Sequence, residues 1–167
     1  MGYRSDLIIT HAFTSEEQMK EVLASFCVDK RFAEYDIVNV MHVGKECTSD
    51  NKWTFFVMFK IESWKWYEDS IIDLAYADVA CVNHFLTLCK QFNEQRGFPF
   101  GYKFFRVGED YEDIEEREDS SKCQEGERLE DFLASNVFVS RAIDHTLHNL
   151  KTLKEYSRET LSQESTV

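Results

Sequence analysis

The fold is decided by one stretch of alternating residues, Trp53-Thr54-Phe55-Phe56-Val57-Met58-Phe59-Lys60-Ile61-Glu62. Its odd-numbered side chains are large and apolar, and this period of two predicts a strand. The β-branched run at residues 35–43 predicts a second strand. Residues 45–52 between them are polar and include the turn-forming Ser49-Asp50-Asn51, so we expect the two strands to form a hairpin.

Two further strands and two helices follow from the residues on either side. Upstream, the apolar run at residues 7–13 predicts a strand, and the spacing of Thr14 and Glu17 predicts a helix N-terminus directly after it. Downstream, residues 72–89 carry an apolar stripe of helical period, and residues 102–107 predict a fourth strand. This order predicts an α+β protein with a ferredoxin-like antiparallel sheet and two helices on one face.

The composition favours a single domain. Of the 167 residues, 43% are hydrophobic, and with 6 glycines and 1 proline the chain has no Pro- or Gly-rich linker. We predict one α+β domain over residues 1–143, followed by a C-terminal helical tail over residues 144–167. A helix predicted over residues 140–161 carries a narrow apolar stripe, which would allow a homo-oligomer to form through this C-terminal helix. The stripe consists of Ile143, Leu147, Leu150 and Leu153.

Negative charge is concentrated in the acidic segment, residues 109–131, within the predicted domain. The whole chain has a formal charge of −12, and this segment holds twelve acids against three bases, which is −9. The rest of the chain is therefore nearly balanced. Direct nucleic-acid binding through this segment is disfavoured, because affinity for a phosphate backbone comes from cations that release counterions.

The candidate partner-binding residues are six carboxylates at the start of that segment: Glu109, Asp110, Glu112, Asp113, Glu115 and Glu116. As a mimic of nucleic-acid charge, they could occupy a basic groove on another protein by salt-sensitive association. A metal site would need carboxylates from different elements, whereas these come from one local stretch without the loop pattern of an EF-hand. The simplest interpretation is a solvated, partly helical connector.

An aromatic block, Trp64-Lys65-Trp66-Tyr67, follows the strongest predicted strand directly. Its two tryptophans could stack on a planar ligand or anchor a protein partner. Lys65 and Arg106 supply the cations that a nucleotide would need, and Lys103 should project from the opposite face of its strand to Arg106. The alternative is that Trp64 or Trp66 simply closes the end of the sheet.

No group in the sequence has the pattern of a catalytic or cofactor site. His11 and His42 lie on predicted strands that we expect to be neighbours, but no Ser or Cys nucleophile on a sharp turn accompanies them. The five cysteines lack the spacing of zinc pairs, and reduced thiols in a cytosol are the economical interpretation. We therefore assign no catalytic residue, metal ligand or cofactor. No stretch of about 18 residues is free of charge, so no membrane-spanning helix is predicted.

Three pieces of the chain, taken together, resemble a group of small tailed-bacteriophage proteins of unassigned activity. They are the opening Met1-Gly2-Tyr3-Arg4-Ser5-Asp6, the block Trp64-Lys65-Trp66-Tyr67-Glu68, and the Gly-Glu-Asp-rich run of residues 105–117. Residues 139–143 resemble the usual end of that group, so the likeness covers about residues 1–143. It implies a phage accessory protein in the cytoplasm of an infected bacterium, and it implies no catalytic residues.

The leading hypothesis is a non-enzymatic phage accessory protein that binds and modulates or inhibits a host protein with a basic surface. Its target could be an antiviral-defence or nucleic-acid-handling factor, bound through the acidic and aromatic residues. The first alternative is a nucleotide-binding sponge that sequesters a small signalling ligand. The second is a metal-assisted hydrolase that uses the carboxylates with His11 and His42.

Overall fold

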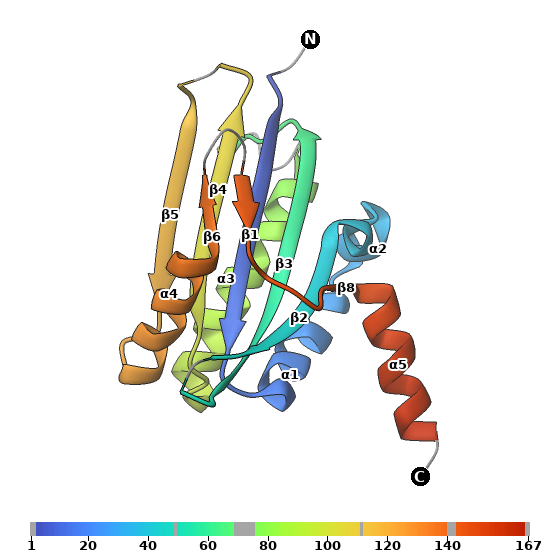
Figure 1. The fold of residues 1–167 in the computed structure, drawn as a ribbon. Helices are drawn as coiled ribbons and strands as arrows, with labels where there is room; N and C mark the ends of the chain where they lie inside the picture. The colour runs from blue at the N-terminus through green and yellow to red at the C-terminus, as the bar shows by residue number, and fades with distance from the viewer. Residues whose placement is uncertain (1–2, 49, 69–75, 111, 140–142, 166–167) are drawn as a thin grey trace.

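The computed structural model describes residues 3–48, 50–68, 76–110, 112–139 and 143–165 (Figure 1). It confirms an α+β fold with a large antiparallel sheet. In chain order the elements are β1 (Ser5–Phe13), α1 (Glu16–Cys27), α2 (Lys30–Glu34), the 3₁₀ turn η1 (Ile37–Val40), β2 (Met41–Cys47), β3 (Trp53–Trp64), α3 (Ala77–Arg96), β4 (Gly101–Gly108), β5 (Ile114–Ser120), α4 (Gln124–Asn136), β6 (Val137–Val139), β7 (Ile143–His145), β8 (Lys151–Thr152) and α5 (Leu153–Ser165).

The main sheet has six strands in the order β5-β4-β1-β3-β2-β8, and each adjacent pair is antiparallel. The predicted hairpin is β2 and β3, and its register places Val43 opposite Val57. Four strands were predicted, so β5 and β8 are additions at the two edges. A small second sheet consists of β6 and β7.

One face of the sheet is covered by α1 and α3 (behind the sheet in Figure 1). The side chain of Ser15, one residue after Thr14, caps α1 by accepting a hydrogen bond from Gln18 N–H, which satisfies an otherwise unpaired helix-end donor. The core on this face is rich in phenylalanine. Its fully buried rings include Phe13, Phe26, Phe59, Phe85 and Phe104, and each such ring contributes about 1.5–3 kcal/mol on burial.

The other face is also covered, which the two-helix prediction did not include. There α4, the β6–β7 hairpin and the segment at residues 146–150 lie over the sheet (in front in Figure 1). Phe56 and Met58 of β3 are fully buried in this second core with Leu129 and Leu133 of α4. Since the middle of β3 is buried on both faces, its even-numbered positions Phe56 and Met58 are apolar as well, as expected for a central strand covered on both sides.

The prediction of a helix over residues 140–161 is wrong up to Thr152. Residues 140–142 lie outside the described residues, Ile143 begins β7, and helix starts only at Leu153. Leu147 is buried in the second core, where Ile143 and Leu150 pack against it, whereas Leu153 is buried in the first core. The four side chains are therefore divided between two cores and form no helical seam for self-association.

The second predicted strand is also displaced. It was expected at residues 35–43, but β2 spans Met41–Cys47, and α2 and η1 occupy the residues before it. Asp36 has φ 51°, in the left-handed region, so the chain turns there and cannot continue as a strand. The second long helix, α3, ends at Gly97 (φ 70°), which terminates it in the left-handed conformation. The first part of its predicted stripe, residues 72–75, lies outside the described residues.

Candidate functional site

The acidic segment is not one connector. Residues 109–110 and 112–113 lie between β4 and β5, residues 114–120 are strand β5, and residues 124–131 open α4. β5 is the outermost strand of the main sheet, beside β4 (Figure 1). Side chains alternate along a strand, so its acids are divided between two faces.

Arg106 neutralises two of the six candidate carboxylates. Its guanidinium lies 2.8 Å from Asp113 and 3.0 Å from Glu115 and also donates to the Ser5 hydroxyl. The hydrogen bonds from Arg106 hold the pKa of Asp113 below its usual range. The Tyr3 hydroxyl donates to the same carboxylate (2.7 Å), which ties the start of the chain to this loop.

Arg117 joins the acidic segment to the residues after β3. Its guanidinium pairs with Glu68 and with Glu115, and it stacks 4.1 Å from the centre of the Phe104 ring. Glu68 also accepts from the indole N–H of Trp66 (2.7 Å). Burial alone would raise the pKa of Glu68, but these hydrogen bonds outweigh it, so its pKa lies below the usual value.

Most of the aromatic block is structural. Trp66 is 7% exposed and packs 6.0 Å from Phe104, whereas Trp64 ends β3 half-buried. The Tyr67 hydroxyl accepts from the backbone N–H of Tyr3 (3.1 Å). Lys65 is half-buried. Since the Trp66 ring is enclosed and the Arg106 guanidinium already holds two carboxylates, a stacked nucleotide would have to displace core contacts here.

Lys103 and Arg106 lie on opposite faces of β4, as expected. The Lys103 side chain is 5% exposed, pairs with Glu116, and reaches Glu118 at 3.5 Å. Its amino group also lies 5.0 Å from the centre of the Phe105 ring. A charge this enclosed needs its carboxylates, so Lys103 is not free for a ligand.

Four further acids near this edge of the sheet are exposed to solvent. Asp110, Glu112, Glu116 and Glu118 are exposed, and we call these four residues the acidic edge. Among the described residues, Lys103 is the cation that pairs with members of this set, namely Glu116 and Glu118. Glu109 is also exposed, and its carboxylate accepts from the backbone N–H of Arg4 (2.8 Å). The outer side of β5 pairs with no described strand.

The expectation that His11 and His42 are neighbours is wrong. β3 lies between their strands, because β1 pairs with β3 and β4. His11 is 1% exposed and stacks on Phe85 (4.5 Å between ring centres), and burial lowers its pKa to about 3. Neither of its ring nitrogens has a hydrogen-bond partner. Nowhere in the described ranges do three His, Cys, Asp or Glu side chains gather as a metal site requires.

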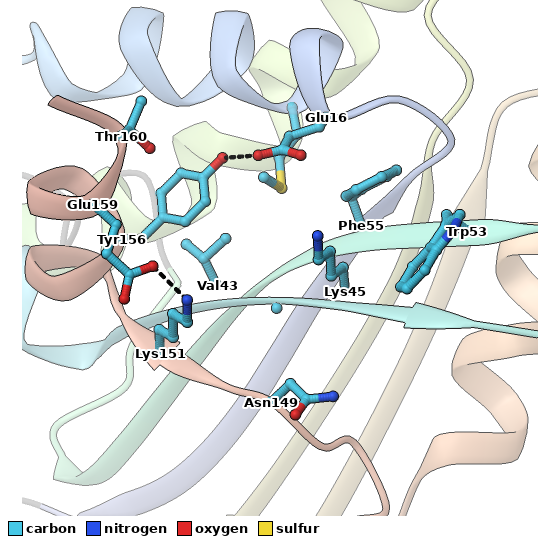
Figure 2. Close-up of a pocket in the computed structure, with 12 residues that line it drawn as sticks. Glu16, Val43, Lys45, Trp53, Phe55, Asn149, Lys151, Tyr156, Glu159 and Thr160 are labelled. Atoms are coloured by element: carbon cyan, nitrogen blue, oxygen red, sulfur yellow. Dashed lines mark hydrogen bonds and ion pairs between the residues drawn. The ribbon is translucent and has the colours of Figure 1, made fainter. Parts of the chain in front are cut away.

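A cavity of about 410 Å³ lies where the β2–β3 hairpin, the start of α1 and α5 meet (Figure 2). We call it the hairpin pocket. Val43, Lys45 and Phe55 form its floor, Glu16 and Met19 line it from α1, and Tyr156, Glu159 and Thr160 line it from α5, with Trp53 at one side. The hairpin pocket is not predictable from the sequence, because the residues of α5 are expected there in a C-terminal tail and Trp53 only in a strand.

Two polar contacts shape the hairpin pocket. The Tyr156 hydroxyl donates to Glu16 (3.0 Å), and burial with this bond raises the pKa of Tyr156 above its usual range. Lys151 pairs with Glu159. These contacts hold α5 against α1 and β8.

Comparisons with protein-family models, with curated proteins and with solved structures find no match to this chain. Within the described residues, no helix is both long enough and apolar enough to cross a membrane. The functional argument therefore depends on the geometry of the chain's own side chains.

Proposed function

We propose that this protein is a non-enzymatic tailed-bacteriophage accessory protein. It acts in the cytoplasm of the infected bacterium and binds a host protein with a basic surface, such as an antiviral-defence or nucleic-acid-handling factor. The phage origin rests on the sequence resemblance. The binding activity rests on one observation, which is the acidic edge itself. Its four carboxylates are exposed beside the outer, unpaired side of β5, and Lys103 is the cation that pairs with them among the described residues.

The division of charge within the acidic segment supports this proposal. Asp113 and Glu115 pair with Arg106, and Asp119 pairs with Lys90 (3.2 Å), so these acids hold the fold together. Among the residues that the structure describes, the acidic edge has no comparable set of cations. A basic partner would restore that balance, and long-range attraction would speed its approach at low salt.

The strand itself supplies the second half of the recognition. An outermost strand presents unpaired backbone N–H and C=O groups, and an extended segment of a partner can add to it as a further strand. Lysine or arginine side chains on that segment would then face Glu116 and Glu118, since opposite charges on neighbouring strands stabilise each other. The proposed partner segment is therefore extended and basic.

The topology explains why an acidic strand occupies this edge. We propose that β4-β1-β3-β2, with α1 and α3, form a ferredoxin-like sandwich to which β5 and β8 were added. The strand order and the antiparallel pairing support this. In such a sandwich β4 would be an edge, and β5 replaces that edge with an acidic one.

The test compares two variants of equal charge. The edge variant combines Asp110→Asn, Glu112→Gln and Glu118→Gln, and it leaves the Lys103–Glu116 pair in place. The control variant combines Glu34→Gln, Glu94→Gln and Glu155→Gln, which are exposed acids on α2, α3 and α5. Each tagged protein is used to capture proteins from a bacterial lysate at low and at physiological salt.

We expect the wild type and the control variant to retain the same host protein and the edge variant to lose it. The captured protein, once purified, should bind the wild type more weakly as salt rises. If the edge variant retains the protein as well as the wild type does, the acidic edge is not the docking surface. If the wild type retains no specific protein, the proposed function fails.

The two alternatives have less support from the geometry. A nucleotide sponge at the aromatic block would need the Trp66 ring, which is enclosed in the core. A metal-assisted hydrolase would need His11 beside His42, and β3 separates them.

A further inference from the structure

We propose that the hairpin pocket binds a small organic anion that carries an aromatic ring, with the anionic group on Lys45 and the ring against Trp53. This site is separate from the acidic edge and does not depend on the function proposed above. The argument rests on the charges that line the pocket, on its aromatic wall and on its size.

The first observation is an uncompensated cation. Lys45 rises from β2 into the space between Tyr156 and Phe55 (Figure 2), and among the described side chains it has no ion pair. The two acids of the pocket are already engaged. Glu159 pairs with Lys151, and Glu16 accepts from Tyr156 and lies 3.7 Å from Lys20. Among the described side chains of the pocket, Lys45 therefore carries a positive charge that no acid pairs with, in a chain whose formal charge is −12.

The second observation is an exposed aromatic wall. The Trp53 side chain is 49% exposed, although large aromatic side chains of a soluble domain are mostly buried. The Lys45 amino group lies 5.3 Å from the centre of its ring, so the cation and the indole are presented together. Phe55 lies beside them on the floor. A planar group that stacks here places its acidic substituent within reach of Lys45.

The third observation is the size and polarity of the space. At about 410 Å³ the cavity falls within the usual range for small-molecule sites, which is roughly 300–1,000 Å³. Asn149 and Thr160 line it with an amide and a hydroxyl that can bind further polar atoms of a ligand. A single ring system with one phosphate or carboxylate group fits these features, whereas a polymer would need a longer groove.

The sequence explains how the cation and the ring come together. Lys45 lies opposite Phe55 in the β2–β3 register, and Trp53 lies opposite Cys47, so alternation places all four on the same face. In the described ladder β8 pairs with His42 and Val43 of β2, so its pairing ends before Lys45. α5 then closes one side of the cavity through Tyr156 (Figure 2).

The experiment uses the full-length protein and four probes. Adenosine 5′-monophosphate and indole-3-acetate carry both an aromatic ring and an anion, adenosine carries only the ring, and inorganic phosphate only the anion. Binding is measured by calorimetry and by amide chemical shifts. The variants are Lys45→Gln and Trp53→Leu, with Lys30→Gln as a control on α2, where the side chain is exposed and lines no part of the pocket.

We expect the two ring-bearing anions to bind saturably and to shift the amides of Lys45, Trp53 and Tyr156. Lys45→Gln should weaken binding by about tenfold or more, which is the loss expected for one charge-assisted contact. Trp53→Leu should also weaken it, and Lys30→Gln should not. Adenosine and phosphate should each bind more weakly than the nucleotide.

Any of four results would overturn the proposal. The first is that neither ring-bearing anion binds. The second is that Lys45→Gln binds them as well as the wild type does, and the third is that the shifted amides lie elsewhere. If phosphate alone binds as tightly as the nucleotide, the ring contributes nothing and the two-part recognition is wrong. A negative result for the hairpin pocket does not contradict the proposal for the acidic edge, because the two sites share no residue and the edge variant retains every residue of the pocket.

Discussion

Acid should destabilise this protein through His11. The imidazole is fully enclosed between Phe85 and Tyr102, and neither nitrogen has a hydrogen-bond partner, so the native protein holds it neutral. Its pKa falls from 6.5 to about 3 on folding. The unfolded chain therefore binds a proton that the native protein does not, and stability decreases as the pH falls below 6.5 and continues to decrease until about 3.

The size of the effect follows from the two pKa values. Each pH unit between them costs about 1.4 kcal/mol of unfolding free energy, so His11 accounts for a loss of about 2 kcal/mol between neutral pH and about pH 5. The test variant is His11→Leu, which has a similar volume and cannot titrate. His148→Gln, at an exposed histidine, is the control. The unfolding free energy is measured by urea titration, in reductant, at about pH 7.5 and about pH 5.

We expect the wild type and His148→Gln to lose about 2 kcal/mol more than His11→Leu over this interval. The carboxylates and His42, whose pKa burial also lowers, are present in all three proteins. Their contributions to the change in unfolding free energy therefore cancel in the comparison. If His11→Leu loses as much stability as the wild type, the buried imidazole is not the cause. Should the variant fail to fold, the His11 ring signals of the wild type decide the question by NMR, since they should not titrate above about pH 4.

Four further substitutions at three positions test an ion pair, a close packing contact and a helix cap. Arg106→Gln should destabilise the protein by about 1–3 kcal/mol, because it removes the cation from Asp113 and leaves Glu115 with Arg117 alone, and urea unfolding will measure this. Gly126→Ala should cost about 1–3 kcal/mol by overpacking, because the new Cβ would lie 2.0 Å from the Ser121 carbonyl oxygen; an unchanged melting temperature would contradict this. Ser15→Ala should cost about 1 kcal/mol through loss of the α1 cap, and Ser15→Asn should restore most of it.

Local pattern predicted the central elements because their signals are short-range. β1, β3, β4, α1 and α3 each bury a face whose apolar period can be read within a dozen residues. β5 has no such signal. Two of its inward-facing side chains, Glu115 and Arg117, are charged. Their partial burial depends on ion pairs with distant residues, Arg106 of β4 for Glu115 and Glu68 for Arg117. Its composition therefore predicted a connector where the structure has a strand.

The candidate site was predictable in part. Composition located the acidic segment, and strand alternation correctly placed Lys103 and Arg106 on opposite faces. It did not show which carboxylates are engaged, because that depends on pairings such as Arg106 with Asp113 across a loop. The hairpin pocket was out of reach altogether, because Tyr156 and Glu16 meet across 140 residues of sequence.

The sequence by itself therefore determined the α+β class, the central strands and helices and the position of the negative charge, since these depend on period and composition. Only the tertiary structure decided the strand order and the covering of the second face of the sheet. It also decided which acids form ion pairs within the fold and which are exposed, and it placed Lys45 and Trp53 beside α5 in one pocket. The physical reason is the range of the interactions. A hydrophobic period acts between residues two to four apart, whereas ion pairs and cavities form between segments that only the complete fold brings together.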